Sequence, residues 1–127
     1  MTTTRIFIAI GSILAGLSVA AGAFASHALK DQLSEKAIAI FETGAKYQMY
    51  HALALLFIAL LLSRAESFST GLISAGIAFI IGIVIFSGSL YALSLSGIKW
   101  LGAITPIGGV AFILGWGILA IAAFNYK

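Results

Sequence analysis

The chain of 127 residues contains no cysteine and a single proline, and only 9% of its residues are charged. The absence of cysteine excludes disulfide bonds, thiolate metal sites and cysteine nucleophiles. In soluble globular domains about a quarter of the residues are charged. A chain this poor in charge has too few charged side chains to cover a water-exposed surface. Its seven basic residues are scattered, without the basic stripe and interleaved aromatic residues typical of nucleic-acid binding.

Hydrophobic residues make up 61% of the chain and gather in long uncharged runs. About twenty such residues in a helix cross the hydrocarbon core, and a helix satisfies its own backbone hydrogen bonds there. The alternating pattern of a transmembrane β-barrel is missing. The sequence predicts one all-α domain over residues 1–127, an integral membrane four-helix bundle with antiparallel neighbours. The predicted spans are 6–25, 47–63, 70–93 and 106–124.

Two boundaries need separate reasoning. The run 6–25 follows Arg5 like the core of a secretory signal, but its uncharged length favours a membrane span. For the last span, the sequence predicts Thr105 as N-cap and Pro106 at the first helical position, where its missing N–H costs nothing. The alternative is a longer helix from Trp100 that is kinked at Pro106.

The segment between the first two spans is the only long polar connection. Within 34–46 the apolar residues recur at helical spacing, and Ser34 is a suitable N-cap. This pattern predicts an amphipathic interfacial helix between spans 1 and 2. It either lies along the membrane surface and bends into the second span, or forms the water-exposed first turns of that span.

Polar and aromatic side chains concentrate in residues 41–51. On a helix Glu42, Lys46 and Tyr50 share one face, and Tyr47 and His51 share an adjacent face. We expect His27, at the end of the first span, to reach the same side of the membrane as His51. Two histidines at similar depth can ligate haem or contact a quinone. The competing interpretation is ordinary interfacial tyrosine and histidine beside a Glu42–Lys46 helical ion pair.

The candidate residues follow from this segment. No catalytic residue is predicted, because no nucleophile-elbow pattern is present. No metal site is predicted either, since two histidines without cysteine fall short of the four ligands of structural zinc. The candidate cofactor-binding residues are His27, His51 and Tyr47, and the candidate ligand-binding residues are Glu42, Lys46, Gln48, Tyr50 and Tyr91.

Small residues recur at four-residue spacing along the spans, a pattern that lets membrane helices approach closely. In the first span they are Ser12, Gly16 and Ala20, beside Ser18, Gly22 and Ser26. The pattern is compatible with a tight bundle, a homo-oligomer or a docking face for a larger membrane complex. No acidic residue lies within a predicted span, which argues against proton-coupled export.

Distinctive sequence motifs lie at 22–30, 41–56, 86–91 and 101–109, followed by Gly115 and Trp116. These motifs resemble those of the domain-of-unknown-function 423 family, small bacterial inner-membrane proteins similar to eukaryotic transmembrane protein 256. The resemblance covers nearly the whole chain and implies a four-helix, multi-pass protein of the inner (plasma) membrane, but it implies no reaction or cofactor. The matching polar residues and proline are His27, Glu42, Tyr47, Gln48, Tyr50, His51, Ser87, Ser89, Tyr91, Thr105 and Pro106.

The resulting functional hypothesis is a non-enzymatic membrane protein whose partners are the lipid bilayer and other membrane helices. It acts by self-association or as an accessory subunit of a larger complex. The first alternative is a haem-, quinone- or lipid-binding site at the rim formed by His27 and His51. The second alternative is a small-molecule transporter. Basic residues are nearly balanced between the two sides, so the sequence predicts no orientation.

Overall fold

The computed structural model describes residues 2–127, and over that range the chain is helical with short connections and no strand. Four continuous helical segments are long and apolar enough to cross a membrane. The predicted all-α, four-helix membrane bundle is therefore confirmed. The elements are α1 (Thr2–His27), α2 (Glu35–Arg64), α3 (Thr70–Gly82), the π-helical turn η1 (Ile83–Ser87), α4 (Gly88–Ser96), the 3₁₀ helix η2 (Lys99–Ala103) and α5 (Thr105–Ala123).

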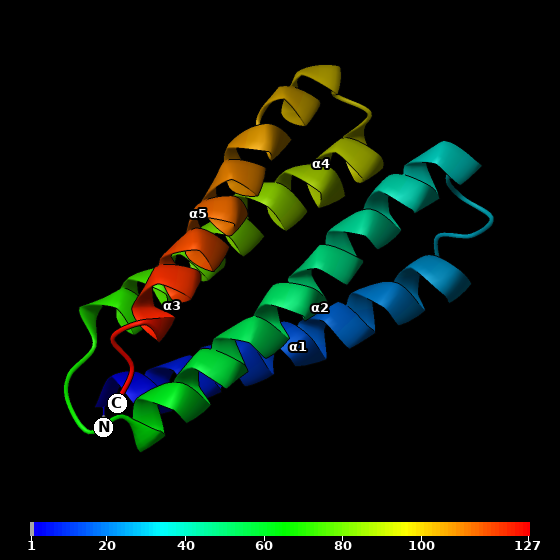
Figure 1. Cartoon of the computed structure of the whole chain (residues 1–127). Helices are drawn as coiled ribbons and strands as arrows, with labels where there is room; N and C mark the ends of the chain where they lie inside the picture. Colours follow the sequence, from blue (N-terminus) through cyan, green and yellow to red (C-terminus); the bar gives the residue numbers. More distant parts are fainter. Residues whose placement is uncertain (1) are drawn as a thin grey trace.

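The helices form two antiparallel hairpins, α1 with α2 and α3–η1–α4 with α5 (Figure 1). Helix α2 is central, because it contacts α1, α3, η1 and α4, whereas α1 packs chiefly on α2. Both termini lie at the same end of the bundle (Figure 1). There the backbone N–H of Glu66 donates to the carbonyl of Lys127 at 2.9 Å, which ties the end of the chain to the α2–α3 connection.

The segment 34–46 is helical as expected, and of the two predicted alternatives the structure has the second, because the segment forms the first turns of the second span rather than a separate interfacial helix. Ser34 is the N-cap, and its hydroxyl accepts the N–H of Ala37 at 3.1 Å. The helix is uninterrupted, and Phe41 and Gly44 in its first turns are buried, with Tyr91 of α4 packed against Gly44. With 30 residues α2 is about 45 Å long, and its first turns extend beyond a hydrocarbon core of about 30 Å.

The third and fourth spans differ in detail from the prediction. The third runs from Thr70 to Ser96 through the π-helical turn and ends at Gly97, which has a left-handed φ of 71°. The prediction that Thr105 caps α5 is wrong, because Ile104 occupies the N-cap without a side-chain cap. The Thr105 hydroxyl is instead 2.6 Å from the hydroxyl of Ser89, so it joins α5 to α4. Pro106 lies in the first turn of α5, preceded by η2.

Phenylalanine side chains packed on glycine hold the helices together. The ring of Phe7 occupies the space that a Cβ at Gly76 would need, which brings α1 against α3. At Gly108 the obstacle is the backbone nitrogen of Phe86, so α5 and η1 touch main chain to main chain. Close approach of this kind increases dispersion contact, which drives helix association in lipid together with interhelical hydrogen bonds. Glycine therefore allows tight packing at Gly76 and Gly108, whereas Gly16 and Gly22 of the small-residue pattern in the first span have no neighbour within 4 Å of an added Cβ.

Candidate functional site

His51 lies at mid-length in α2 and is only 4% exposed. The indole N–H of Trp116, from α5, donates to its Nε2 at 3.0 Å. Because Nε2 accepts, the proton of the neutral ring must be on Nδ1, which lies 2.8 Å from the carbonyl of Tyr47 and donates to it. Both ring nitrogens are thus engaged within the bundle, and the imidazole plane is fixed between α2 and α5.

Aromatic side chains surround this imidazole. The ring of Phe112 stacks on it at 3.6 Å between centroids and an angle of 9°. Phe79 also contacts it, in a tilted arrangement with centroids 5.4 Å apart. Two glycines make this arrangement fit, since Phe112 fills the space above Gly82 and Phe79 lies 2.6 Å from where a Cβ of Gly115 would be. The glycine pattern of α3 and α5 therefore positions the rings around the histidine.

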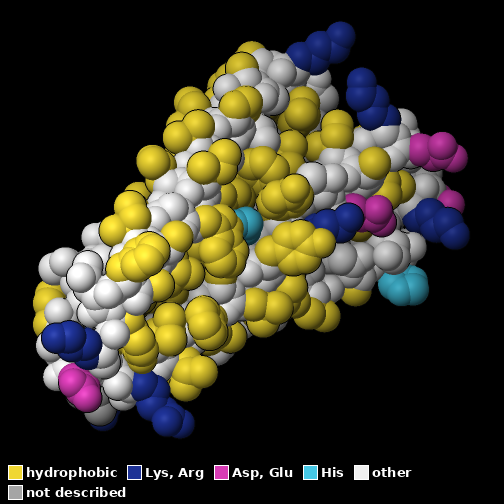
Figure 2. Space-filling view, viewed as in Figure 1, with side chains coloured by type: hydrophobic (Ala, Val, Ile, Leu, Met, Phe, Trp, Pro, Cys, Tyr) yellow, Lys and Arg dark blue, Asp and Glu magenta, His cyan; other side chains and the backbone are white. Residues whose placement is uncertain are grey.

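Beside this stack the surface is hollowed between α2 and α5. The aromatic groove has a volume of about 520 Å³. Its rim includes Tyr47 and Tyr50, which are 38% and 52% exposed, and neither phenol hydroxyl has a hydrogen-bond partner within residues 2–127. Figure 2 shows one histidine recessed among hydrophobic side chains at mid-length. The lining residues are Tyr47, Tyr50, His51, Phe86, Gly109, Phe112, Ile113 and Trp116.

A second hollow, the polar trough, lies on the other side of Tyr50 between α1 and α2. It has a volume of about 440 Å³, and Tyr50 lines both the trough and the aromatic groove. Figure 2 shows basic and acidic side chains on the face that carries the recessed histidine. A further hollow towards the α1–α2 connection shares Ser26 and Glu42 with the trough. The trough is lined by Ser18, Gly22, Ser26, Glu42, Ala45, Lys46, Met49 and Tyr50.

The structure does not bring His27 and His51 together. Ser18 of α1 donates to the carbonyl of Ala45 at 2.6 Å, which fixes the level at which the two helices meet. His27 is the exposed last residue of α1 and lies on one side of this level, whereas His51 lies on the other. The two histidines are therefore about 22 Å apart along the helix axes, and the expected common rim is wrong. The reason is that α2 begins twelve residues before the predicted second span, so His51 lies deeper than expected.

The other predicted residues divide into two groups. Tyr47, Tyr50, Glu42 and Lys46 line the two hollows. Gln48 and Tyr91 instead serve the packing of the bundle. The amide of Gln48 donates to the carbonyl of Leu14 at 2.7 Å and accepts from the Tyr91 hydroxyl at 2.6 Å.

Two serines of the third span, Ser87 from the sequence motifs and Ser94 outside them, also bridge helices. Ser87, in the π-helical turn, donates to the carbonyl of Gly44 at 2.7 Å. Ser94, in α4, donates to the carbonyl of Ala37 at 2.6 Å. In lipid such bonds give a partner to hydroxyl groups that would otherwise have none. These side chains are therefore structural links between α2 and the third span.

Sequence reasoning missed the residues of α5 that complete the site. Phe112 and Trp116 are four residues apart on one helical face, which is the signal that could have indicated an aromatic surface. Phe79 and Phe86 add to it from α3 and η1. Periodicity alone does not say which helix such a face meets, so the link to His51 required the tertiary structure.

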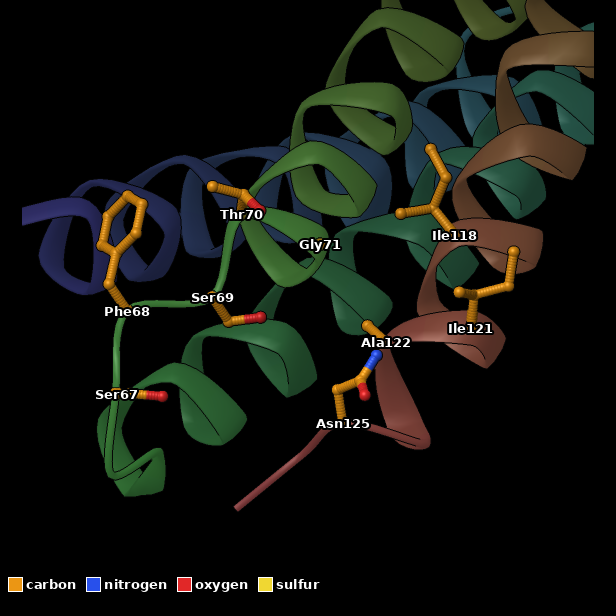
Figure 3. Close-up of a pocket in the computed structure, with 9 residues that line it drawn as sticks. All are labelled: Ser67, Phe68, Ser69, Thr70, Gly71, Ile118, Ile121, Ala122 and Asn125. Carbon is orange, nitrogen blue, oxygen red and sulfur yellow. The ribbon is translucent and has the colours of Figure 1, made fainter.

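A fourth hollow, of about 460 Å³, lies at the end of the bundle that holds the termini. Figure 3 shows Ser67 and Ser69 from the α2–α3 connection opposite Asn125, which follows α5. The hydroxyl of Ser69 is occupied as the N-cap of α3, accepting from Leu72 N–H at 3.2 Å. No charged residue lines this hollow, so it has no group to pair with a charged ligand, unlike the polar trough. Over residues 2–127 no group of three or more histidine, cysteine or acidic side chains is placed to hold a metal ion.

Comparisons with known proteins give a consistent result. The model of a family described as "Protein of unknown function (DUF423)" matches residues 21–109. A "UPF0382 membrane protein" of Staphylococcus epidermidis is 47% identical over 122 residues, which cover 96% of this chain and 98% of that protein. The "UPF0382 membrane protein YwdK" of Bacillus subtilis is 44% identical over the same shares of the two chains. No solved structure matches. The names of these relatives state a membrane location and no reaction or ligand.

Proposed function

The chain belongs to the DUF423 family of bacterial membrane proteins, and from that premise we propose that it acts without catalysis, by binding a lipophilic molecule of the bilayer in the aromatic groove. The observation that carries this proposal is the groove itself, about 520 Å³ of mainly aromatic surface that is open at mid-length of α2 and α5. Apolar hollows with a few polar groups at the rim are typical ligand sites. Here the rim offers the hydroxyls of Tyr47 and Tyr50.

The state of His51 supports binding rather than catalysis or haem ligation. Its Nε2 accepts from Trp116 and its Nδ1–H donates to Tyr47, so the ring holds no spare lone pair for a metal or a proton transfer. An axial haem bond would first have to break the contact with Trp116. A lipid chain or a quinone, in contrast, needs only flat apolar walls and a hydrogen-bond donor at the rim.

The test uses Trp116 as the reporter, in a Trp100→Phe background that removes the other tryptophan. Lipids with brominated chains quench indole fluorescence on contact, so binding from mild detergent should give saturable quenching. Gly109→Leu should abolish the saturable part, because the groove is lined by Gly109 and a Cβ there meets Phe86 only at 3.9 Å, without a clash. Gly117→Leu is the matched control, since it adds the same side chain to α5 outside the groove.

The outcomes separate cleanly. Saturable quenching that is lost in Gly109→Leu and kept in Gly117→Leu supports the proposal. Quenching that rises linearly with the lipid fraction, and equally in all variants, means that Trp116 only meets bulk lipid, and the proposal is then wrong.

Self-association is the second candidate function, and the outer face of α1 favours it. A Cβ added at Gly16 would meet nothing within 4 Å, and Ser12 and Ala20 are exposed on the same face. Only 17% of the most apolar part of α1 is buried, compared with 44% for α2. We propose a second copy as the occupant of this face, with an accessory position on a larger complex as the alternative.

Native mass measurement in mild detergent distinguishes these roles. A dimer that dissociates in Gly16→Leu but persists in Gly117→Leu supports self-association through α1. A monomer that cross-links in native membranes to a different protein supports the accessory role. A monomer without any cross-linked partner contradicts both. Transport gains no support from the bundle, because Leu55, Ile58 and Phe79 fill its middle with 0% exposure.

A further inference from the structure

The polar trough has open space beside two charged side chains, Glu42 and Lys46, near the edge of the hydrocarbon core. Charge is unusual at that depth. A Cβ at Gly22 would meet nothing within 4 Å, so α1 leaves the floor of the trough open beside Glu42 and Lys46. Both charged side chains are exposed and lie four residues apart on α2. Charged groups facing the edge of the hydrocarbon core are costly unless they find partners. The trough therefore has the features of a site for a polar molecule within the bilayer.

The depth of the two charges follows from the helix. Lys46 lies about 27 Å along α2 from Arg64, close to the thickness of the hydrocarbon core of about 30 Å. Glu42 lies about 6 Å further out, towards the start of α2. Tyr50 lies about 6 Å further in than Lys46. It borders both the polar trough and the aromatic groove. From the interface inward, the order is a carboxylate, an ammonium group and then an apolar aromatic surface.

A phospholipid with a primary amine in its headgroup has the complementary order. Its ammonium group is outermost, its phosphate follows, and its acyl chains extend towards the middle of the bilayer. We propose that the polar trough binds an ethanolamine-type phospholipid, with the phosphate at Lys46 and the ammonium group at Glu42. Both contacts, Lys46 with the phosphate and Glu42 with the ammonium group, join two ionised groups, so each is a charge-assisted hydrogen bond.

The acyl chains continue past Tyr50. This residue lines both hollows, so a chain that leaves the trough passes Met49 and Tyr50 and reaches the aromatic groove. This part of the inference rests on the proposed function, because it identifies the lipophilic molecule in that groove. The assignment of the headgroup rests only on Glu42 and Lys46 and does not depend on the proposed function.

Headgroup chemistry makes the inference specific. A choline headgroup carries the same charges, but its quaternary ammonium group has no N–H to donate to Glu42. A glycerol headgroup keeps the phosphate for Lys46 and has no cation for Glu42. Affinity for both should be about tenfold lower than for the ethanolamine lipid, the ratio expected for one charge-assisted hydrogen bond.

The experiment titrates the full-length protein in mild detergent with ethanolamine, choline and glycerol phospholipids that share the same brominated chains. The readouts are Trp116 quenching in the Trp100→Phe background and the lipid adducts seen by native mass spectrometry. Glu42→Ala, which leaves no acceptor at this position, should remove the preference for ethanolamine over choline. Lys46→Gln should weaken all three lipids about tenfold. Glu66→Gln and Lys99→Gln are charge controls outside the trough and should change nothing.

The two readouts keep this inference separate from the proposed function. If the three lipids bind equally and Gly109→Leu still abolishes the saturable quenching, the headgroup site is overturned and the aromatic groove remains supported. Adducts with the ethanolamine preference, but no saturable quenching, support the headgroup site and contradict the groove. No adducts and no quenching contradict both.

Two other occupants would also be recognised. Displacement of the lipid by soluble phosphoethanolamine at equal concentration would make the trough a site for a free zwitterion and overturn the lipid assignment. A species of twice the mass, lost in Gly22→Leu, would place a second copy in the trough and overturn it as well.

Discussion

The indole N–H of Trp116 donates to Nε2 of His51 at 3.0 Å and joins α5 to the middle of α2, across 65 residues of sequence. This bond fixes which ring nitrogen of His51 carries the proton, and Nδ1–H then donates to the carbonyl of Tyr47 at 2.8 Å. It also orients the indole as one wall of the aromatic groove. One polar contact thus sets the shape of the site and links the two hairpins.

Removing this donor should therefore loosen the contact between α2 and α5. Trp116→Phe keeps an aromatic ring but leaves Nε2 of His51 without a partner. Hydrogen bonds between membrane helices contribute about 0.6 kcal/mol on average and up to about 1.7 kcal/mol, and we expect a loss of free energy of unfolding near the upper value because the histidine is buried. Unfolding by titration of mild detergent with a denaturing detergent measures it.

The control is Trp100→Phe, since Trp100 is 65% exposed in η2. It should leave the free energy of unfolding unchanged. ¹⁵N NMR of labelled histidine gives a second check, because the wild-type ring should show its proton on Nδ1. A proton on Nε2 would contradict the hydrogen-bond pattern directly.

Adjacent glycines in α5 should respond in opposite ways to alanine. A Cβ at Gly108 would collide with the backbone of Phe86, whereas a Cβ at Gly109 would touch the Phe86 ring only at 3.9 Å. Gly108→Ala should cost about 1–3 kcal/mol, because α5 must move away from η1. Gly109→Ala should be neutral or stabilising by up to about 1 kcal/mol, because alanine favours the helix over glycine.

The same unfolding titration compares the two variants. Equal effects would mean that α5 and η1 are not in contact along this line. Far-ultraviolet circular dichroism before denaturation checks that both variants keep their helices, so that the difference reports packing rather than loss of the fold.

The spans were predictable from sequence because the bilayer imposes a length and an apolar composition that 6–25 and 70–93 both show. The depth of the site was not. Lys46 looked like the border of the second span, but long basic side chains can extend to the interface from within a helix. Because α2 begins at Glu35, His51 lies at mid-length of the helix, away from His27.

The partners of His51 lay beyond sequence reasoning for a second reason. Helical periodicity places Phe112 and Trp116 on one face of α5, but the register between α5 and α2 depends on contacts such as the Phe112 ring above Gly82. Small residues mark where helices can approach and do not say which helix approaches. Thr105 illustrates the same limit, since its hydroxyl is 2.6 Å from that of Ser89 instead of capping its own helix.

The Thr105 link gives a further prediction. Thr105→Val removes the hydroxyl and keeps the shape, so Ser89 loses its side-chain partner on α5. We expect a loss of about 0.6–1.7 kcal/mol in the free energy of unfolding. Thr43→Val is the control, because the Thr43 hydroxyl bonds only to the Ala39 carbonyl of its own helix and is exposed. An equal loss in both variants would show that the link between α4 and α5 carries no stability.

The last prediction concerns the polar chain that runs from α1 through α2 to α4. Gln48 donates to Leu14 and accepts from Tyr91, so its single side chain holds three helices in register. A double-mutant cycle with Tyr91→Phe and Gln48→Leu separates the two contacts. Tyr91→Phe leaves the amide oxygen of Gln48 unpaired, whereas in the Gln48→Leu background the Tyr91 hydroxyl has already lost its acceptor.

The coupling energy between the two sites should therefore be about 1 kcal/mol, within the range of interhelical hydrogen bonds in membranes. Tyr91 packs over Gly44, 3.0 Å from where a Cβ would be, so Tyr91→Phe keeps the ring in place and changes only the hydroxyl. Tyr126→Phe is the matched control, because its hydroxyl donates to the Leu61 carbonyl at the far end of the bundle. Its effect should add to that of Gln48→Leu without coupling. A coupling energy near zero for Tyr91 would mean that the hydrogen bond between Tyr91 and Gln48 contributes no stability, and that the serine link from Ser94 to Ala37 holds α4 to α2 instead.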